Sequence, residues 1–155
     1  MIKKNKSFII YLSISVILNL IHINIFNIDL TPDFILLTLI FWFFKNPNMM
    51  MPISIFWLIG LMTDILMGDL LGQYALTYAC CYFIAQYFRK KILLNNKHQQ
   101  LTYVFLIFLS AQIIMLTINV MHDLHYPGLS YFSQSISAIF IWYILSKFSF
   151  FKFDH

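Results

Sequence analysis

Residues with chemical potential are few in this chain, and the most unusual group lies between positions 60 and 72. Gly60, Asp64 and Gly68 follow one another at intervals of four, and Gly72 continues the pattern. On a continuous helix this spacing stacks the residues along one face. Glycines let another backbone approach closely, and a carboxylate at the edge of hydrocarbon must be paired, solvated or turned toward protein. The pattern therefore predicts a packing face for the rest of the bundle, and it is compatible with a turn between two helices at Gly68-Asp69.

A second set of polar side chains interrupts apolar stretches near the expected outer ends of membrane-spanning helices. This outer polar rim consists of Asn19, His22, Gln73, Asn119 and Gln134. Polar groups without partners are costly in lipid, so these side chains are expected to face one another or trapped water. Two interpretations stay open here. The rim is either a hydrogen-bond network between helices or an outward-facing pocket for a ligand or a partner segment.

The sequence gives little support for an enzyme. No second carboxylate accompanies Asp64 at a fixed spacing, and the sequence shows neither a nucleophilic-serine elbow nor a glycine-rich phosphate loop. His122, Asp123 and His125 are interpreted as solvated loop residues rather than metal ligands. We therefore predict no catalytic residue, no metal, no cofactor and no enzyme. The basic residues lie beside hydrophobic stretches, a placement that does not indicate nucleic-acid binding.

The composition predicts an all-α integral membrane protein. Hydrophobic residues make up 61% of the 155 residues and charged residues only 10%, with no glutamate, and the mean hydropathy is +0.78. A soluble domain carries about 25% charged residues. Six spans of roughly 20 residues use about 120 residues. We therefore expect one transmembrane domain over residues 1–155 and no separate soluble domain.

The second of the six expected spans is short. Residues 34–44 make only about 16 Å of helix, so this span must borrow the turn before it. In that turn Thr31 is the expected N-cap, Pro32 the first-turn proline and Asp33 the acid that complements the helix dipole. The expected spans are about 8–26, 30–45, 49–67, 70–88, 101–121 and 130–147.

The distribution of charge predicts the orientation. With a cytoplasmic N-terminus, six spans place all ten Lys and Arg residues on inside segments, including Lys45 and the expected polar loop Arg89-Lys90-Lys91. Four of the six aspartates then lie on or next to outside segments. The positive-inside rule is satisfied without exception, which predicts an N-in/C-in topology. A re-entrant second span would force Arg89-Lys90-Lys91 to the outside.

Two motifs give the chain a resemblance to a known family. The first motif, Thr31-Pro32-Asp33-Phe34-Ile35-Leu36-Leu37, opens the second span. The second motif begins in the third span and reads Gly60-x-x-x-Asp64-x-x-x-Gly68-x-x-Leu71-Gly72. With the length, the six hydrophobic segments and the basic mid-chain loop, this layout resembles the rod shape-determining membrane protein family MreD. The residues expected to serve partner binding or packing are Pro32, Asp33, Gly60, Asp64, Gly68, Leu71 and Gly72.

What this resemblance implies is non-enzymatic. Proteins of the MreD family belong to the bacterial elongation machinery (elongasome) in the inner, cytoplasmic membrane. They associate with MreC and act with MreB filaments, RodA and a class B penicillin-binding protein. Their fold is similar to that of the substrate-binding subunits of energy-coupling-factor transporters. The resemblance thus implies a multi-pass scaffold subunit that contacts the lipid bilayer and supports peptidoglycan synthesis and cell-shape maintenance.

The sequence leaves two functions open. In the first, the Gly60/Asp64/Gly68 face and the outer polar rim hold a partner's transmembrane or juxtamembrane segment. This hypothesis predicts that Gly60→Leu or Asp64→Leu weakens association with MreC while the protein still inserts. The alternative is a small-solute binding or transport subunit with an outward-facing pocket.

Overall fold

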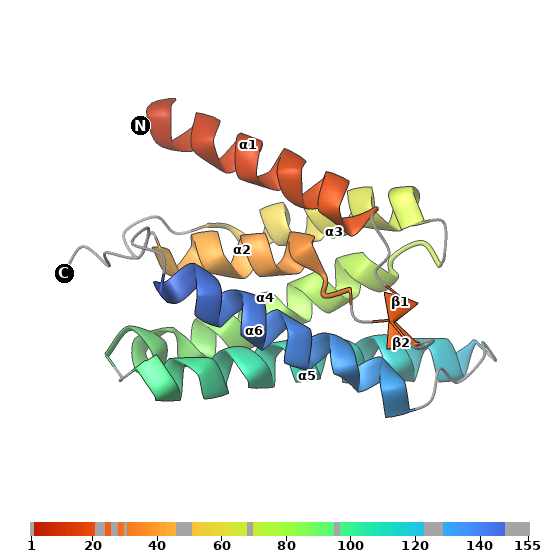
Figure 1. Ribbon diagram of the computed structural model, residues 1–155. Helices are drawn as coiled ribbons and strands as arrows, with labels where there is room; N and C mark the ends of the chain where they lie inside the picture. The colour runs from red at the N-terminus through yellow and green to blue at the C-terminus, as the bar shows by residue number, and fades with distance from the viewer. Residues whose placement is uncertain are drawn as a thin grey trace.

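The computed structural model is a bundle of antiparallel helices with a very short β ladder at one end (Figure 1). It describes residues 2–20, 24–25, 28–29, 31–45, 51–67, 70–94, 97–122 and 129–147. The helices are α1 (Ile2–Asn19), α2 (Phe34–Lys45), α3 (Ile53–Met67), α4 (Gln73–Leu94), α5 (Lys97–Met121) and α6 (Ser133–Lys147). The strands β1 (Asn24–Ile25) and β2 (Ile28–Asp29) precede α2, and a 3-10 helix, η1 (Leu129–Phe132), precedes α6. For the described residues, the predicted all-α architecture with six helices is confirmed.

The two ends of the bundle differ in charge. Helix α1 begins and α6 ends at the same end (Figure 1). Helices α2 and α4 also finish there, since the Arg89 guanidinium lies 4.7 Å from the centroid of the Phe43 ring. We call this the basic end, after Lys45 and Arg89-Lys90-Lys91. The opposite end, which carries β1, β2 and the first turns of α2, α4 and α6, is called the polar end.

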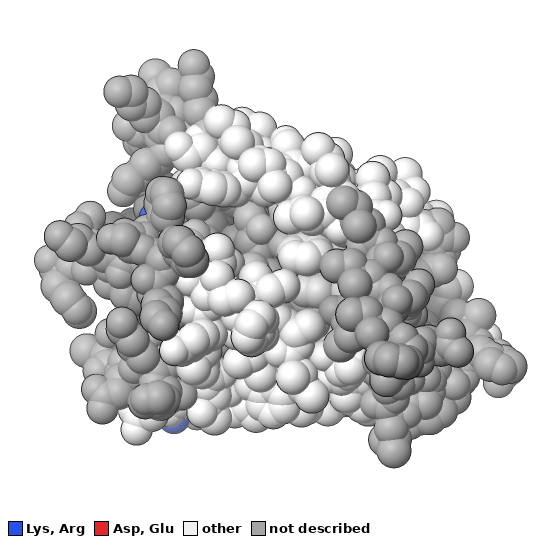
Figure 2. Space-filling model, in the orientation of Figure 1, with Lys and Arg blue, Asp and Glu red and all other residues white. Residues whose placement is uncertain are grey.

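Large apolar side chains cover the outside of the bundle. On α3, for example, Leu58, Met62 and Ile65 are 54%, 64% and 71% exposed. In the face shown in Figure 2, the described residues carry charge only near the basic end. Among the described helices, the stretch Gln99–Met121 of α5 is long and apolar enough by length and composition to cross a membrane, and four shorter helices are apolar. An exterior of this kind indicates burial in lipid.

Helix α4 occupies the centre and packs against α2, α3 and α5. Aromatic rings hold three of these helices together. The Phe43 ring of α2 lies 6.1 Å from that of Phe56 on α3 and 5.5 Å from that of Tyr82 on α4, and the last two lie 5.1 Å apart. Edge-to-face and tilted arrangements at these distances are the favoured ones.

Two helix boundaries differ most from the predicted ones. Helix α1 ends at Asn19 instead of continuing to residue 26, and β1 pairs antiparallel with β2. Asparagine and β-branched isoleucine are weak helix formers, so the segment rich in these residues adopts extended pairing. The predicted loop Arg89-Lys90-Lys91 belongs to α4, which continues to Leu94, because Arg and Lys are good helix formers and no breaker precedes that point.

Candidate functional site

Gly60, Asp64 and Gly72 form a junction between α3 and α4 of the same chain. Asp64 is only 2% exposed. Its Oδ1 accepts a hydrogen bond from the Tyr74 N–H (2.7 Å), and its Oδ2 accepts bonds from the N–H groups of Gly72 (3.0 Å) and Ala75 (3.2 Å). These N–H groups lie at the start of α4, where they have no partner within the helix. Asp64 thus caps α4 from α3 and brings negative charge to the positive end of the helix dipole.

Two glycines make this junction possible. Gly72 has a φ of +97°, which side-chain-bearing residues rarely adopt. Since it stands just before α4 and has no side chain, it cannot cap the helix, and the acceptor comes from α3 instead. At Gly60, a Cβ would lie 2.5 Å from the Ala75 Cα and 2.8 Å from the Tyr74 carbonyl oxygen. The two helices therefore meet there in backbone contact, which only a residue without a side chain permits.

This placement confirms that Gly60 and Asp64 pack against the rest of the bundle, and it corrects their assignment to a partner. The Gly60 and Asp64 face expected to hold a partner's helix is covered by α4 of the same chain. Gly72 does not extend that face, because α3 ends at Met67. Leu71 is 80% exposed and takes no part in the junction. Gly68 lies outside the described residues.

Asp33 makes a second cap. Its Oδ1 accepts hydrogen bonds from the N–H groups of Ile35 (3.1 Å) and Leu36 (3.0 Å), so Asp33 is the N-cap of α2. The prediction that Thr31 has this role was wrong, because the helix begins only at Phe34. The Asp33 Oδ2 accepts a bond from the Tyr78 hydroxyl at 2.7 Å.

This second cap also joins α2 to α4. Tyr78 lies on α4 and is fully buried. Pro32, directly before the cap, is buried as well. Two carboxylates, Asp64 on α3 and Asp33 just before α2, thus organise the first turns of α4 and α2, and both contact α4.

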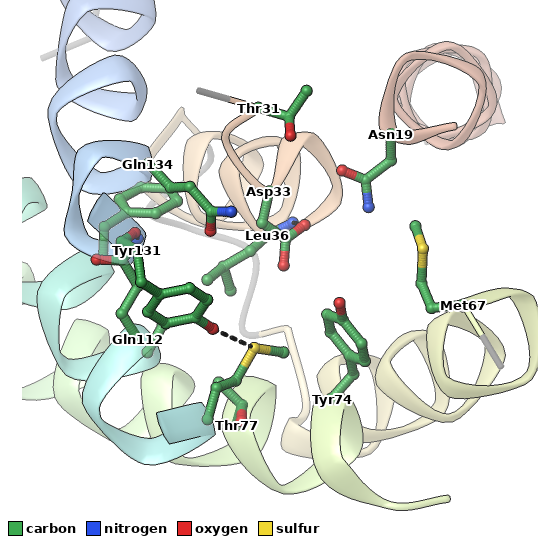
Figure 3. A pocket seen from close by; sticks show the side chains of 13 residues that line it. Asn19, Thr31, Asp33, Leu36, Met67, Tyr74, Thr77, Gln112, Tyr131 and Gln134 are labelled. Atoms are coloured by element: carbon green, nitrogen blue, oxygen red, sulfur yellow. Dashed lines mark hydrogen bonds between the residues drawn. The ribbon is translucent and has the colours of Figure 1, made fainter. Parts of the chain in front are cut away.

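A cavity of about 130 Å³ lies at the polar end, with lining residues from all six helices. Asn19, Asp33, Tyr74 and Gln134 turn polar groups toward the same space (Figure 3). Leu36 and other apolar side chains complete the wall. Asp33 is the one acidic side chain in the lining that the structure describes. The cavity can therefore accept hydrogen bonds at its carboxylate and both donate and accept them at the Asn19 and Gln134 amides.

The outer polar rim is divided between two arrangements. The Gln73 Nε2 donates to the Asn119 Oδ1 at 2.7 Å, a bond that joins α4 to α5. Asn19 and Gln134, in contrast, line the cavity. The hydrogen-bond network between helices is thus confirmed for Gln73 and Asn119, while a ligand or partner segment in the cavity beside Asn19 and Gln134 stays a prediction. His22 lies outside the described residues.

Gln112 and Tyr78 are interior polar groups that were not predicted from the sequence. The Gln112 Nε2 donates to the Tyr131 carbonyl oxygen at 3.1 Å, and its Oε1 accepts a bond from the Ser135 hydroxyl. These contacts join α5 to α6 and to η1. An amide in the middle of an apolar span is itself a signal, because it must face protein to find partners. Tyr78 gives no such signal, since tyrosine is equally common at membrane interfaces.

The apolar exterior, the antiparallel helices and the polar contacts in the interior are the architecture of a helical membrane protein. The family model for MreD, described as rod shape-determining protein MreD, matches residues 2–153 of the 155 residues. The chain therefore belongs to the MreD family, a family of membrane proteins, and this membership implies a role in determining rod shape. No curated protein and no solved structure matches the chain.

Proposed function

We propose that the protein is a non-enzymatic scaffold subunit of the bacterial cell-elongation machinery. In this proposal it binds MreC in the cytoplasmic membrane and supports peptidoglycan synthesis together with MreB, RodA and a class B penicillin-binding protein. The observation that carries the proposal is the family match over residues 2–153. The interior is consistent with a structural role, because the carboxylates of Asp33 and Asp64 both serve as helix caps.

The proposal includes six crossings with both ends of the chain in the cytoplasm. The gathering of Lys45 and Arg89 at one end of the bundle supports this orientation. Helix α2 has only 12 residues, about 18 Å of helix, against a hydrocarbon core of about 30 Å. Non-helical backbone is tolerated at membrane depth where protein surrounds it. The capped turn at Asp33, which is bonded to Tyr78, meets that condition and can complete the second crossing.

Partner binding is proposed for an outward apolar face, because α4 covers the Gly60 and Asp64 face. On α3, Leu58, Met62 and Ile65 form an exposed stripe at helical spacing. On α6, Ile136 and Phe140 are 66% and 65% exposed. A partner helix covers one such stripe in this proposal, and lipid covers the other.

Site-specific photocrosslinking tests this proposal. A photoreactive phenylalanine analogue is placed singly at Met62 or Ile65 on α3, and at the matched exposed positions Ile136 or Phe140 on α6, in cells that produce tagged MreC. We expect crosslinks to MreC from one of the two stripes only. If neither stripe crosslinks and MreC is absent from the purified membrane complex, the scaffold proposal fails.

The cavity at the polar end favours a second candidate, a small-solute binding or transport subunit. Its support is the convergence of the Asn19, Asp33 and Gln134 side chains on one space. In a thermal-shift screen of the purified protein, this candidate predicts saturable stabilisation by a small polar solute, lost in the Gln134→Leu variant. If no solute stabilises the protein and its depletion abolishes rod shape, the scaffold is favoured.

A further inference from the structure

A second hollow lies away from the cavity, in a groove of about 330 Å³ between α1, α2 and α6. Its walls are almost entirely apolar, with Ile14 and Leu18 from α1, Leu37 from α2 and Leu145 from α6. The face shown in Figure 2 is hollowed below α1. Among the described residues, none that we expect to serve partner binding or the outer polar rim lines this groove.

One cation lies at the basic end of the groove. Lys45 lines it, and the Lys45 Nζ lies 5.5 Å from the centroid of the Phe41 ring, which also belongs to the wall. The long stem of lysine can lie along apolar surface while its ammonium group stays at the level of the lipid headgroups. The groove therefore combines an apolar channel with a positive charge at one end.

The length of the groove matches one leaflet of a bilayer. It follows α2 from Phe34 to Lys45, a rise of about 16 Å. Half of the hydrocarbon core is about 15 Å. With Lys45 at the cytoplasmic surface, as the proposed orientation requires, the groove extends from the headgroups to the middle of the bilayer.

We propose that this groove binds one acyl chain of an anionic phospholipid from the cytoplasmic leaflet, with Lys45 beside the lipid phosphate. The apolar walls bind the chain, and the ammonium group favours a negatively charged headgroup. The positive charge of Lys45 at one end favours an anionic lipid over the apolar transmembrane helix of a partner as the occupant.

Native mass spectrometry of the full chain in neutral detergent tests whether the Lys45 charge selects an anionic lipid. The protein is titrated with phosphatidylglycerol and with phosphatidylcholine of the same acyl chains. We expect one retained lipid, with phosphatidylglycerol bound about fivefold more tightly, since a basic residue near an anionic surface contributes about 1 kcal/mol. Lys45→Gln should remove most of this preference. Lys90→Gln is the matched control, because Lys90 is exposed at the basic end and does not line the groove.

Larger side chains in the wall test whether an acyl chain occupies the groove. Thr38 lines the wall and is half-buried, so Thr38→Phe should lower the occupancy of both lipids at least tenfold. Ile14→Phe, on the α1 wall, is the second variant if Thr38→Phe fails to fold. Three results would overturn the proposal: equal retention of the two phospholipids, unchanged lipid occupancy in the folded filled variant, or photocrosslinking of a partner protein from the groove.

Discussion

Two pairs of neighbouring helices are joined in different ways. In the α3–α4 pair, the Asp64 carboxylate accepts three backbone hydrogen bonds, and the backbones touch at Gly60. In the α1–α2 pair, the Phe8 ring lies 5.4 Å from that of Trp42. The Asn19 Oδ1 accepts one long bond, 3.4 Å, from the N–H of the first residue of α2. Hydrogen bonds to a carboxylate thus fix the first pair, and ring contacts and the long Asn19 bond join the second.

The difference shows what can hold helices together in lipid. Lipid chains are as apolar as leucine, so burial of apolar surface does not drive helices together as it does in water. Close backbone approach and hydrogen bonds then decide which pairs are tight. The α3–α4 pair has both, and its face is closed to partners. Helix α1 meets α2 through the Phe8 and Trp42 rings and the long Asn19 bond, and the apolar groove lies beside it.

The largest loss of stability is expected when the Asp64 carboxylate, which joins α3 to α4, is removed. Asp64→Leu leaves three N–H groups at the start of α4 without an acceptor, so we expect a loss of about 3–5 kcal/mol in the free energy of unfolding. Asp64→Asn keeps one acceptor oxygen and should lose less. The measurement is thermal unfolding in detergent, followed by size-exclusion chromatography with fluorescence detection. A melting temperature that is the same for Asp64→Leu and the unmodified protein would contradict the capping role.

A somewhat smaller loss of stability is expected when Gly60, where the backbones of α3 and α4 touch, is substituted. In Gly60→Ala the new methyl group meets backbone atoms of α4 at 2.5–2.8 Å, so the helices must separate at a cost of about 1–3 kcal/mol. Ile65→Ala, on the outer face of α3 where the side chain is 71% exposed, is the control and should change the melting temperature little. Equal effects of the two substitutions would show that α3 and α4 can separate freely at Gly60.

The turn before α4 offers a test without steric conflict. A Cβ at Gly72 meets no atom within 4 Å, and φ there is +97°. Gly72→Ala should therefore cost about 1 kcal/mol through backbone strain alone. Gly72→Asn should cost less, because asparagine tolerates positive φ better. The same melting assay applies, and a loss for alanine as large as that of Asp64→Leu would mean that the turn does more than position the cap.

The smallest expected effect lies in the α1–α2 pair. Asn19→Leu removes the long bond to the Phe34 N–H, and interhelical hydrogen bonds in membranes contribute about 0.6 kcal/mol. Hydrogen exchange should show faster exchange of the Phe34 amide with little change in the melting temperature. If Asn19→Leu lowers stability as much as Gly60→Ala, the two pairs are joined equally firmly and the comparison does not hold.

The sequence correctly predicted that the rest of the bundle packs at Gly60 and Asp64, and the scaffold hypothesis wrongly gave the same face to a partner. Glycine and aspartate at intervals of four correctly predicted close packing around Gly60 and Asp64. The spacing carries no information about which helix approaches, so a partner's helix was proposed where α4 lies. The cap of α2 was misplaced from Asp33 to Thr31 for a similar reason. Both residue types can cap a helix, and the choice depends on where the chain enters it.

Composition alone determined that this chain is a helical, apolar, membrane-type protein, because the cost of placing charge in hydrocarbon acts on every residue regardless of its neighbours. Only the tertiary structure decided that Asp64 caps α4, that Gln73 bonds Asn119, and that Asn19 and Gln134 meet at a cavity. Hydrogen bonds act over about 3 Å and in fixed directions. They therefore depend on how residues far apart in the sequence are oriented toward one another, and that orientation exists only once the helices have packed.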